Sequence, residues 1–420
     1  MLNILKSYLP PDKFYLYATI LFFFLLGSQQ LISHWFIFIF IALFLINWKK
    51  VFSIEVISLI LFIFSLYGVY AYNHREIFDN YSLTVEVVKK ATMILIVYML
   101  GVSLRGVSRN NLSDERNIFY LVYAFFIAYA IMIIYSYFML PQQHPLTGHG
   151  MQVSYRALYV FYGMVNSTHI AYFLSMVSAL LPFLLIYSKA FRERKFNFLE
   201  LLILYFLAIF SLYLAMQMGR RLTIYMVILI FVLMGARAVW LTLKKHNIYW
   251  ALSLLIGVCL TFAVGYYLLS DSLMAKRILA GGLADKRYEW WIQGLQYMIE
   301  YPWGGAAAIP SHGENPYVHN TWIDIGKGHG ILAFLSLIIF YILHFKYYYR
   351  ILSDKKISDF MKSLVLIVTL VLFLNMLIEP IFKTEQSYFF YSIFFLGFVK
   401  AYADLYIGST EVIPLSLSEK

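Results

Sequence analysis

Long apolar segments follow one another along almost the whole chain, and this feature restricts the fold more than any other. A run of about 17–25 apolar residues is long enough for an α-helix to cross the hydrocarbon core of a bilayer. The sequence contains about twelve such runs, near residues 14–29, 32–48, 51–71, 89–104, 118–140, 169–188, 199–217, 222–243, 248–270, 330–347, 361–380 and 388–406. They are too apolar all round for soluble amphipathic helices and too long for barrel strands. We therefore expect an all-α polytopic integral membrane protein in which residues 1–420 form a single membrane domain.

The composition excludes the other classes. The chain is 62% hydrophobic and 13% charged, whereas globular domains are about 45–50% apolar and about 25% charged. Its single cysteine, Cys259, cannot support a disulfide scaffold. We expect no cleavable signal peptide at the N-terminus, because Asp12 and Lys13 precede the first run and no small-residue cleavage site follows it.

The net charge of +11 comes from the short connections between the spans. Basic residues gather in alternate connections, on the same side as both termini: Lys49, Lys50, Arg105, Arg109, Arg116, Lys189, Arg192, Arg194, Lys195, Lys244, Lys245, Lys346, Arg350, Lys355 and Lys356. Because Lys and Arg accumulate in cytoplasmic loops, we expect both termini in the cytoplasm. No basic block stands apart to suggest a nucleic-acid partner.

The opposite, outer side carries two long loops, residues 141–168 and 271–329, the second between the ninth and tenth spans. Long loops in compact proteins are usually functional, so we expect the chemistry of this protein on the outer face. The tight connector at residues 217–221 also lies there and contains Arg220 and Arg221. We expect Arg221 to begin the next helix, whose N-terminus suits a phosphate. The alternative for this pair is that one arginine snorkels to lipid headgroups and the other caps a helix C-terminus, and for Arg220 this alternative is favoured.

The 271–329 loop predicts an amphipathic helix that begins at Arg287 and lies at the membrane surface. Its apolar residues recur at steps of three and four: Tyr288, Trp291, Leu295, Met298 and Ile299. An ion pair of Arg287 with Asp285 or Glu289 is the alternative to a functional role.

Farther along the same loop, His319-Asn320 opens what we expect to be a short helix, broken by three alternating glycines just before the tenth span. Neutral imidazole is the usual general base near pH 7, although a histidine at this boundary can also be an ordinary surface residue. The loop has no zinc-ligand spacing, nucleophile elbow, phosphate-binding glycine loop or acidic cluster for Mg²⁺. We therefore expect no metal and no cofactor.

Three segments together resemble one family. They are His319-Asn320-x9-Gly330, the connector Met218-Gly219-Arg220-Arg221-Leu222-Thr223, and the helix start Lys286-Arg287-Tyr288-Glu289-Trp290. With about twelve spans and one large loop before the last three, they are similar to the O-antigen ligase and polymerase superfamily of bacterial envelopes, and most similar to the ligases.

The resemblance implies a GT-C-like membrane glycosyltransferase in the bacterial inner membrane, with its active site facing the periplasm. It matches His319, Arg221 and Arg287 to the catalytic residues. It also indicates four candidates for substrate binding: Arg220, Arg156, Lys90 and Asn320.

The expected reaction moves O-antigen polysaccharide from undecaprenyl pyrophosphate to lipid A–core oligosaccharide. Guanidinium groups would bind the leaving pyrophosphate in place of a metal, and a single displacement would invert the anomeric centre. No second carboxylate that could act as a nucleophile for retention is evident in the sequence. The partners are then the lipid-linked glycan donor, the lipid A–core acceptor and membrane lipids, and the sequence leaves the oligomeric state open.

Two alternatives remain. An O-antigen polymerase would join lipid-linked repeat units with the same chemistry. A transporter or flippase should have intramembrane charges and paired broken helices in two halves.

Overall fold

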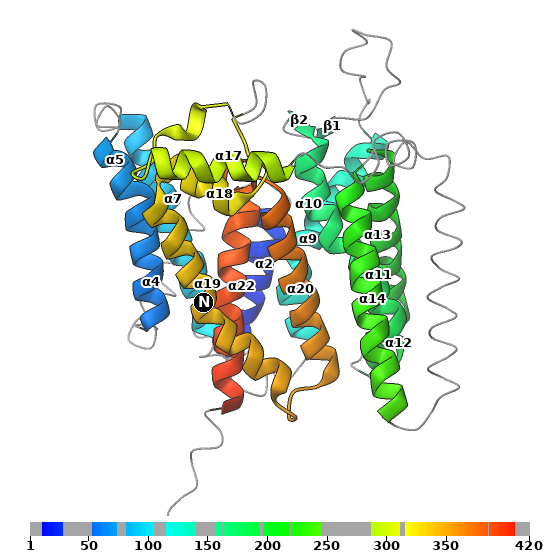
Figure 1. The fold of residues 1–420 in the computed structure, drawn as a ribbon. Helices are drawn as coiled ribbons and strands as arrows, with labels where there is room; N and C mark the ends of the chain where they lie inside the picture. The colour runs from blue at the N-terminus through cyan, green and yellow to red at the C-terminus, as the bar shows by residue number, and fades with distance from the viewer. Residues whose placement is uncertain are drawn as a thin grey trace, which may run out of the picture.

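A computed structural model of the chain describes residues 11–27, 53–73, 81–104, 115–139, 157–160, 163–193, 196–218, 220–244, 287–310, 316–384 and 386–407. It is a bundle of upright helices with one short antiparallel hairpin (Figure 1).

The first half of the bundle contains α2 (Pro11–Gly27), α4 (Ile54–Ile63), the π-helical segment η2 (Phe64–Val69), α5 (Tyr70–Asn73), α7 (Tyr81–Ser103), α9 (Glu115–Met139), the hairpin β1 (Ala157–Val160) and β2 (Gly163–Asn166), α10 (Ser167–Ser178), α11 (Leu180–Ile186), α12 (Ser188–Glu193), α13 (Phe198–Gln217) and α14 (Arg221–Lys244). The hairpin pairs Ala157 with Asn166 and Val160 with Gly163.

The second half contains α17 (Arg287–Glu300), the 3-10 turn η4 (Ala306–Ala308), α18 (Thr321–His329), α19 (Ile331–Ser353), α20 (Asp359–Ile378), α21 (Ile381–Thr384) and α22 (Gln386–Ile407).

The predicted all-α membrane class is confirmed. Within the described ranges, six helices are long and apolar enough to cross a membrane: Glu115–Met139, Thr168–Ile186, Phe198–Gln217, Leu222–Val239, Ile331–Ser353 and Asp359–Ile378. The predicted runs 32–48 and 248–270 lie outside the described residues. The total of twelve spans therefore stays a prediction.

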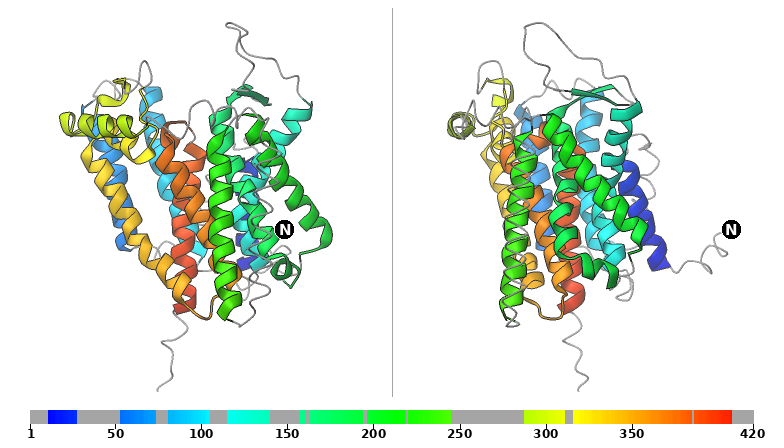
Figure 2. Two further views of the ribbon diagram at one scale, coloured as in Figure 1. Left: turned by 45° about the vertical axis from the view of Figure 1, so that its right-hand side comes forward. Right: turned by 90° about the vertical axis from the view of Figure 1, so that its right-hand side faces the viewer.

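The two ends of the bundle differ. One end, which we call the loop end, carries the β-hairpin and α18, and α17 crosses it almost at right angles to the upright helices (Figure 1). The views in Figure 2 keep these elements at the same end. The other end, the basic end, carries α12 and the turn at residues 354–358. These two segments contain several of the basic residues that we expected on the side of the termini: Lys189, Arg192, Lys355 and Lys356.

The core is rich in aromatic side chains, and α9 is at its centre. This helix packs against α2, α10 and α13. Tyr129 stacks on Phe173 of α10 with ring centroids 3.7 Å apart, and Phe125 stacks on Tyr391 of α22 at 5.2 Å. Because lipid tails are as apolar as these side chains, such close packing, rather than exclusion of water, holds the helices together.

A buried ionic cluster connects α4, α19 and α22 near the basic end. Glu55, in the first turn of α4, forms ion pairs with Lys400 of α22 and, at 2.7 Å, with Lys346 of α19. The hydroxyl of Tyr347 donates a further hydrogen bond to Glu55 at 2.8 Å. A carboxylate buried this deeply needs such partners, because an unpaired charge in an apolar interior is strongly unfavourable.

The close approach of α7 and α22 gives a prediction about stability. A Cβ atom added at Gly101 would lie 2.7 Å from the backbone nitrogen of Phe398, and Gly397 faces it across the contact. Gly101→Val should therefore force the helices apart and destabilise the fold by about 1–3 kcal/mol or more. Thermal unfolding in detergent measures the effect, with Leu202→Val on the exposed face of α13 as control. Equal melting temperatures for the two variants would contradict this packing.

Candidate active site

Three residues from separate parts of the chain meet at the loop end. Nδ1–H of His319 donates a hydrogen bond to Oε2 of Glu379 at 3.1 Å, and Nη2 of Arg287 contacts Oε1 of the same carboxylate at 3.2 Å. Nη1 of Arg287 also donates to the carbonyl oxygen of Ile378 at 3.0 Å. The side chain of Glu379 is 6% exposed, whereas those of Arg287 and His319 are 25% and 22% exposed. The carboxylate of Glu379 is therefore buried, whereas the side chains of Arg287 and His319 remain partly exposed.

The end of α20 supplies the carboxylate. Pro380 cannot continue a helix, and it restricts the preceding residue to an extended conformation. Glu379 accordingly follows the last helical residue with φ −137° and ψ 154°. Its backbone carbonyl accepts a hydrogen bond from the Thr321 hydroxyl at 2.6 Å, and the same hydroxyl oxygen accepts one from the amide of Ile381 at 2.9 Å. These two hydrogen bonds connect the start of α18 to the segment that follows α20.

The start of α18 supplies the imidazole. Asn320 is the N-cap of this helix, and its side chain accepts hydrogen bonds from the amides of Trp322 and Ile323 at 3.0 and 3.1 Å. Asp324 in the first turn accepts from the amides of Val318 and Asn320 at 3.1 and 3.3 Å. These contacts hold the segment on both sides of His319.

His319 itself has a strained backbone. Its φ is +55°, and it is the sole non-glycine residue with positive φ among those that the structure describes. A residue with a Cβ atom in this left-handed region costs about 1–3 kcal/mol, which the surrounding structure has to compensate. Strain of this kind concentrates at functional sites, and here the capping contacts of Asn320 and Asp324 maintain it.

Helix α17 begins at Arg287, as predicted, and packs on α18. The ring of Trp290 lies beside the imidazole of His319, with centroids 5.3 Å apart. The helices approach closely at Gly294, where an added Cβ would lie 2.8 Å from the Val318 side chain. Of the predicted apolar residues of this helix, Met298 is buried in the protein, whereas Tyr288, Leu295 and Ile299 are exposed. The helix crosses the bundle end in Figure 1, as the prediction of a surface-lying helix requires.

Two further features of the loop are structural. Gly330, the last residue of the His-Asn-x9-Gly string, adopts φ +95° between α18 and α19, and an added Cβ would lie 2.5 Å from the Pro302 carbonyl oxygen. Lys327 is fully buried, and its ammonium group donates to the carbonyl oxygens of Ile309 and Pro316. Together they fix the course of the loop around α18.

The other predicted site residues have different outcomes. α14 begins at Arg221, as predicted, but the orientation of this side chain lies outside the description. Arg220 is half-buried and contacts Oδ1 of Asn166, the N-cap of α10, at 3.4 Å. Lys90 is half-buried on α7, which packs chiefly against α22. Arg156 lies outside the described residues. The substrate-binding roles of these residues, and of the N-cap Asn320, stay predictions.

Glu379 is the residue that sequence reasoning missed as a member of the candidate site, where it contacts Arg287 and His319. The sequence did contain a signal. Glu379-Pro380 ends an apolar run on the same side as the long loop, and an ionisable residue at such a position is a functional candidate by default. Its partners could not be deduced, because Arg287 is 92 and His319 is 60 residues away along the chain.

The described part of the chain contains no group of three or more His, Cys, Asp and Glu residues placed to hold a metal ion. A comparison with known protein families found no match. No curated protein sequence matches the chain either.

The arrangement can support proton transfer next to an anion. A carboxylate that accepts from Nδ1 of an imidazole fixes its tautomer and stabilises the imidazolium that forms when Nε2 takes a proton. A guanidinium held a few ångströms away can bind a phosphate oxygen. His319 and Arg287 are positioned by one shared carboxylate, that of Glu379.

Proposed function

We propose that this protein is an inverting membrane glycosyltransferase that moves O-antigen polysaccharide from undecaprenyl pyrophosphate to lipid A–core oligosaccharide. The observation that carries the proposal is the contact of Glu379 with both Arg287 and His319. The residue expected to bind the anion and the residue expected to abstract the proton are thus joined through one carboxylate, at the end of the bundle that carries α17 and α18.

In the proposed reaction, the hydroxyl oxygen of the acceptor sugar attacks the anomeric carbon of the donor glycan. The bond between that carbon and the phosphate oxygen breaks, and its electron pair leaves with the pyrophosphate. Nε2 of His319 takes the hydroxyl proton, while Glu379 stabilises the resulting imidazolium. Arg287 binds the pyrophosphate and strengthens its contact as negative charge develops there. Arg221, at the N-terminus of α14, would add a second guanidinium and the positive end of a helix dipole.

The environment of Glu379 favours inversion. A retaining enzyme would need a carboxylate that reaches the anomeric carbon as a nucleophile. Here one oxygen of the Glu379 carboxylate contacts Arg287 and the other contacts His319, and the Glu379 side chain is 6% exposed. These contacts suit a group that positions its neighbours.

The setting of the reaction is part of the proposal. The basic end would face the cytoplasm, following the distribution of Lys and Arg in short loops, and the loop end would face the periplasm of a bacterium with an inner membrane. The twelve-span, GT-C-like architecture belongs to the same proposal.

A strain that lacks this protein tests the function through its lipopolysaccharide. The band pattern on a gel should lose every core molecule capped with O-antigen and keep uncapped core, and a wild-type copy should restore the ladder. Retention of core molecules carrying a single repeat unit would instead show an O-antigen polymerase. An unchanged ladder would contradict both activities. A His319→Ala copy that is inserted in the membrane serves as the matched inactive control.

A further inference from the structure

Helix α20 is interrupted where it reaches the candidate site. Its last helical residue is Ile378, and the next helix, α21, begins at Ile381. Pro380 between them has no N–H group and cannot continue the helical hydrogen bonds. The last carbonyl groups of a helix and its first amide groups have no partner inside that helix, so the break leaves polar backbone groups that other segments have to bind.

Side chains from two other helices bind these backbone groups. Nη1 of Arg287, at the start of α17, donates to the carbonyl oxygen of Ile378 at 3.0 Å. The hydroxyl of Thr321, at the start of α18, donates to the carbonyl oxygen of Glu379 at 2.6 Å and accepts from the amide of Ile381 at 2.9 Å. One oxygen atom of Thr321 thus bridges the two sides of the break.

This bridge joins the two halves of the candidate site. Thr321 follows His319 by two residues along the chain, so its hydroxyl connects the segment that carries the imidazole to the residue that carries the carboxylate. The hydrogen bond of 3.1 Å between Nδ1 of His319 and Oε2 of Glu379 spans the same junction. The side chain of Thr321 is fully buried, so bulk water does not compete for either backbone group.

The contacts of the Glu379 carboxylate tolerate little displacement. Its distances to His319 and Arg287 are 3.1 and 3.2 Å, whereas N–H···O hydrogen bonds extend from about 2.7 to about 3.2 Å. A shift of the carboxylate by about 0.5 Å away from Nδ1 would therefore break the hydrogen bond. Because the bond at Nδ1 selects the tautomer whose Nε2 can accept a proton, the position of the Glu379 backbone controls the proposed base.

We propose that Thr321 is a positioning residue for the transfer reaction: by bridging the break between α20 and α21, its hydroxyl holds the Glu379 carboxylate within hydrogen-bonding distance of His319. The inference rests on the proposed function for the identity of the reaction. Thr321 acts through Glu379 and touches neither the donor nor the acceptor. Loss of its hydroxyl should therefore lower kcat and leave the KM of the donor nearly unchanged.

Three replacements of Thr321 test the role of its hydroxyl. Thr321→Val keeps the shape of the side chain and removes both hydrogen bonds, which should also destabilise the fold because two buried backbone groups lose their partner. Thr321→Ala leaves space for a water molecule that can bind both groups, so this variant should fold even if the valine variant does not. That water is not attached to α18, and the connection to His319 is still lost. Thr321→Ser keeps the hydroxyl and should behave as the wild type.

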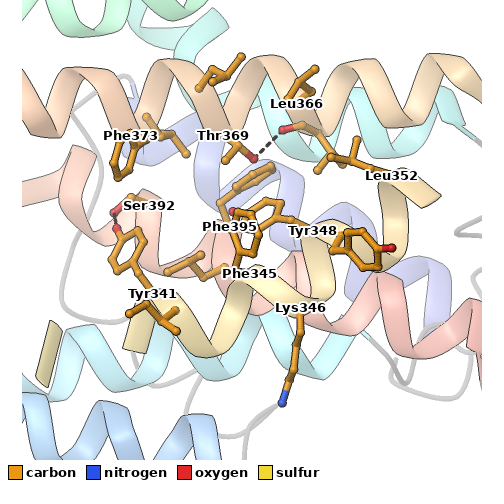
Figure 3. A pocket seen from close by; sticks show the side chains of 16 residues that line it. Tyr341, Phe345, Lys346, Tyr348, Leu352, Leu366, Thr369, Phe373, Ser392 and Phe395 are labelled. Atoms are coloured by element: carbon orange, nitrogen blue, oxygen red, sulfur yellow. Dashed lines mark hydrogen bonds between the residues drawn. The ribbon is translucent and has the colours of Figure 1, made fainter. Parts of the chain in front are cut away.

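Two control variants lie on the same helix, α20. Ser358 caps its opposite end, where the hydroxyl oxygen accepts from the amide of Met361 at 3.2 Å, so Ser358→Ala should lower the melting temperature and leave kcat unchanged. Thr369→Val controls for the substitution itself. The hydroxyl of Thr369 donates to the carbonyl oxygen of Val365 in its own helix at 2.7 Å, beside an apolar cavity between α19, α20 and α22 (Figure 3). This variant should keep the wild-type kcat.

Transfer kinetics and nitrogen-15 NMR of histidine-labelled protein in lipid nanodiscs are the two measurements. The signal of His319 is identified by its absence in His319→Asn. Thr321→Val and Thr321→Ala should lower kcat at least about tenfold and change the donor KM by less than about twofold, because a catalytic group is displaced while binding is kept. The same variants should replace the Nδ1–H tautomer of His319 with a mixture of both tautomers, and Thr321→Ser should restore the single tautomer.

Several outcomes would overturn the positioning role. They are a wild-type kcat in Thr321→Ala, a loss of kcat without a change of tautomer, and an equal loss of kcat in Ser358→Ala. The NMR measurement needs no turnover, so it separates this inference from the proposed function. In a protein whose deletion leaves lipopolysaccharide unchanged, a mixture of tautomers in Thr321→Ala would still support the positioning of His319 by Thr321, and a single Nδ1–H tautomer would overturn it.

Discussion

Replacing His319 with asparagine should reduce glycan transfer by about 10²–10⁴-fold, the usual contribution of a general base, and should leave the fold intact. Asparagine tolerates the left-handed backbone conformation better than most residues with a Cβ atom, so it can keep the φ of +55° that His319 adopts. Its amide cannot accept a proton near neutral pH. Transfer from the lipid-linked donor to the acceptor, measured with purified protein in nanodiscs, gives the rate.

His319→Gly is the control for backbone strain. Glycine adopts positive φ at no steric cost, so this variant should melt at or above the temperature of the wild type and should be as inactive as His319→Asn. Donor affinity should change little in either variant, because the imidazole does not bind the pyrophosphate in the proposed reaction. A His319→Asn protein with wild-type turnover would remove the residue from the mechanism.

Glu379→Gln should lower the transfer rate by about 10²–10⁴-fold, because a neutral amide neither fixes the tautomer of His319 nor stabilises its imidazolium. The same change leaves Arg287 without its ion-pair partner. Since Arg287 is 25% exposed, solvent screens part of this loss, and we expect destabilisation of about 1–3 kcal/mol. The readouts are the rate and the melting temperature of the same preparation.

A second carboxylate–arginine pair in this chain provides the matched control. Glu200 forms an ion pair with Arg116 near the opposite end of the bundle, where Glu200 also caps the start of α13. Glu200→Gln should lower the melting temperature and leave the transfer rate unchanged. If Glu379→Gln lost only as much activity as Glu200→Gln, its role would be purely structural. A shift of the pH–rate profile in Glu379→Gln, absent in Glu200→Gln, would identify Glu379 as the group that positions the base.

The sequence by itself determined the class of fold and much of its outline. A bilayer dictates the length of each spanning helix, so long apolar runs can be read without knowledge of their neighbours. The predicted run 199–217 and the helix α13 (Phe198–Gln217) differ by a single residue. The helix starting at Arg287 and the helix following Asn320 were also predictable, because the signals that start a helix are local: a change of periodicity in one case and an N-cap residue in the other.

The tertiary structure alone decided which residues meet. Glu379 and Glu55 are both acidic residues near one end of an apolar run, yet Glu379 contacts Arg287 and His319, whereas Glu55 contacts Lys346 and Lys400. The strain at His319 is equally invisible in sequence, because the surrounding contacts impose its positive φ. Hydrophobicity sets the depth of a helix in a membrane, whereas pairing of charges and packing of side chains across helices depend on contacts between residues far apart in the chain.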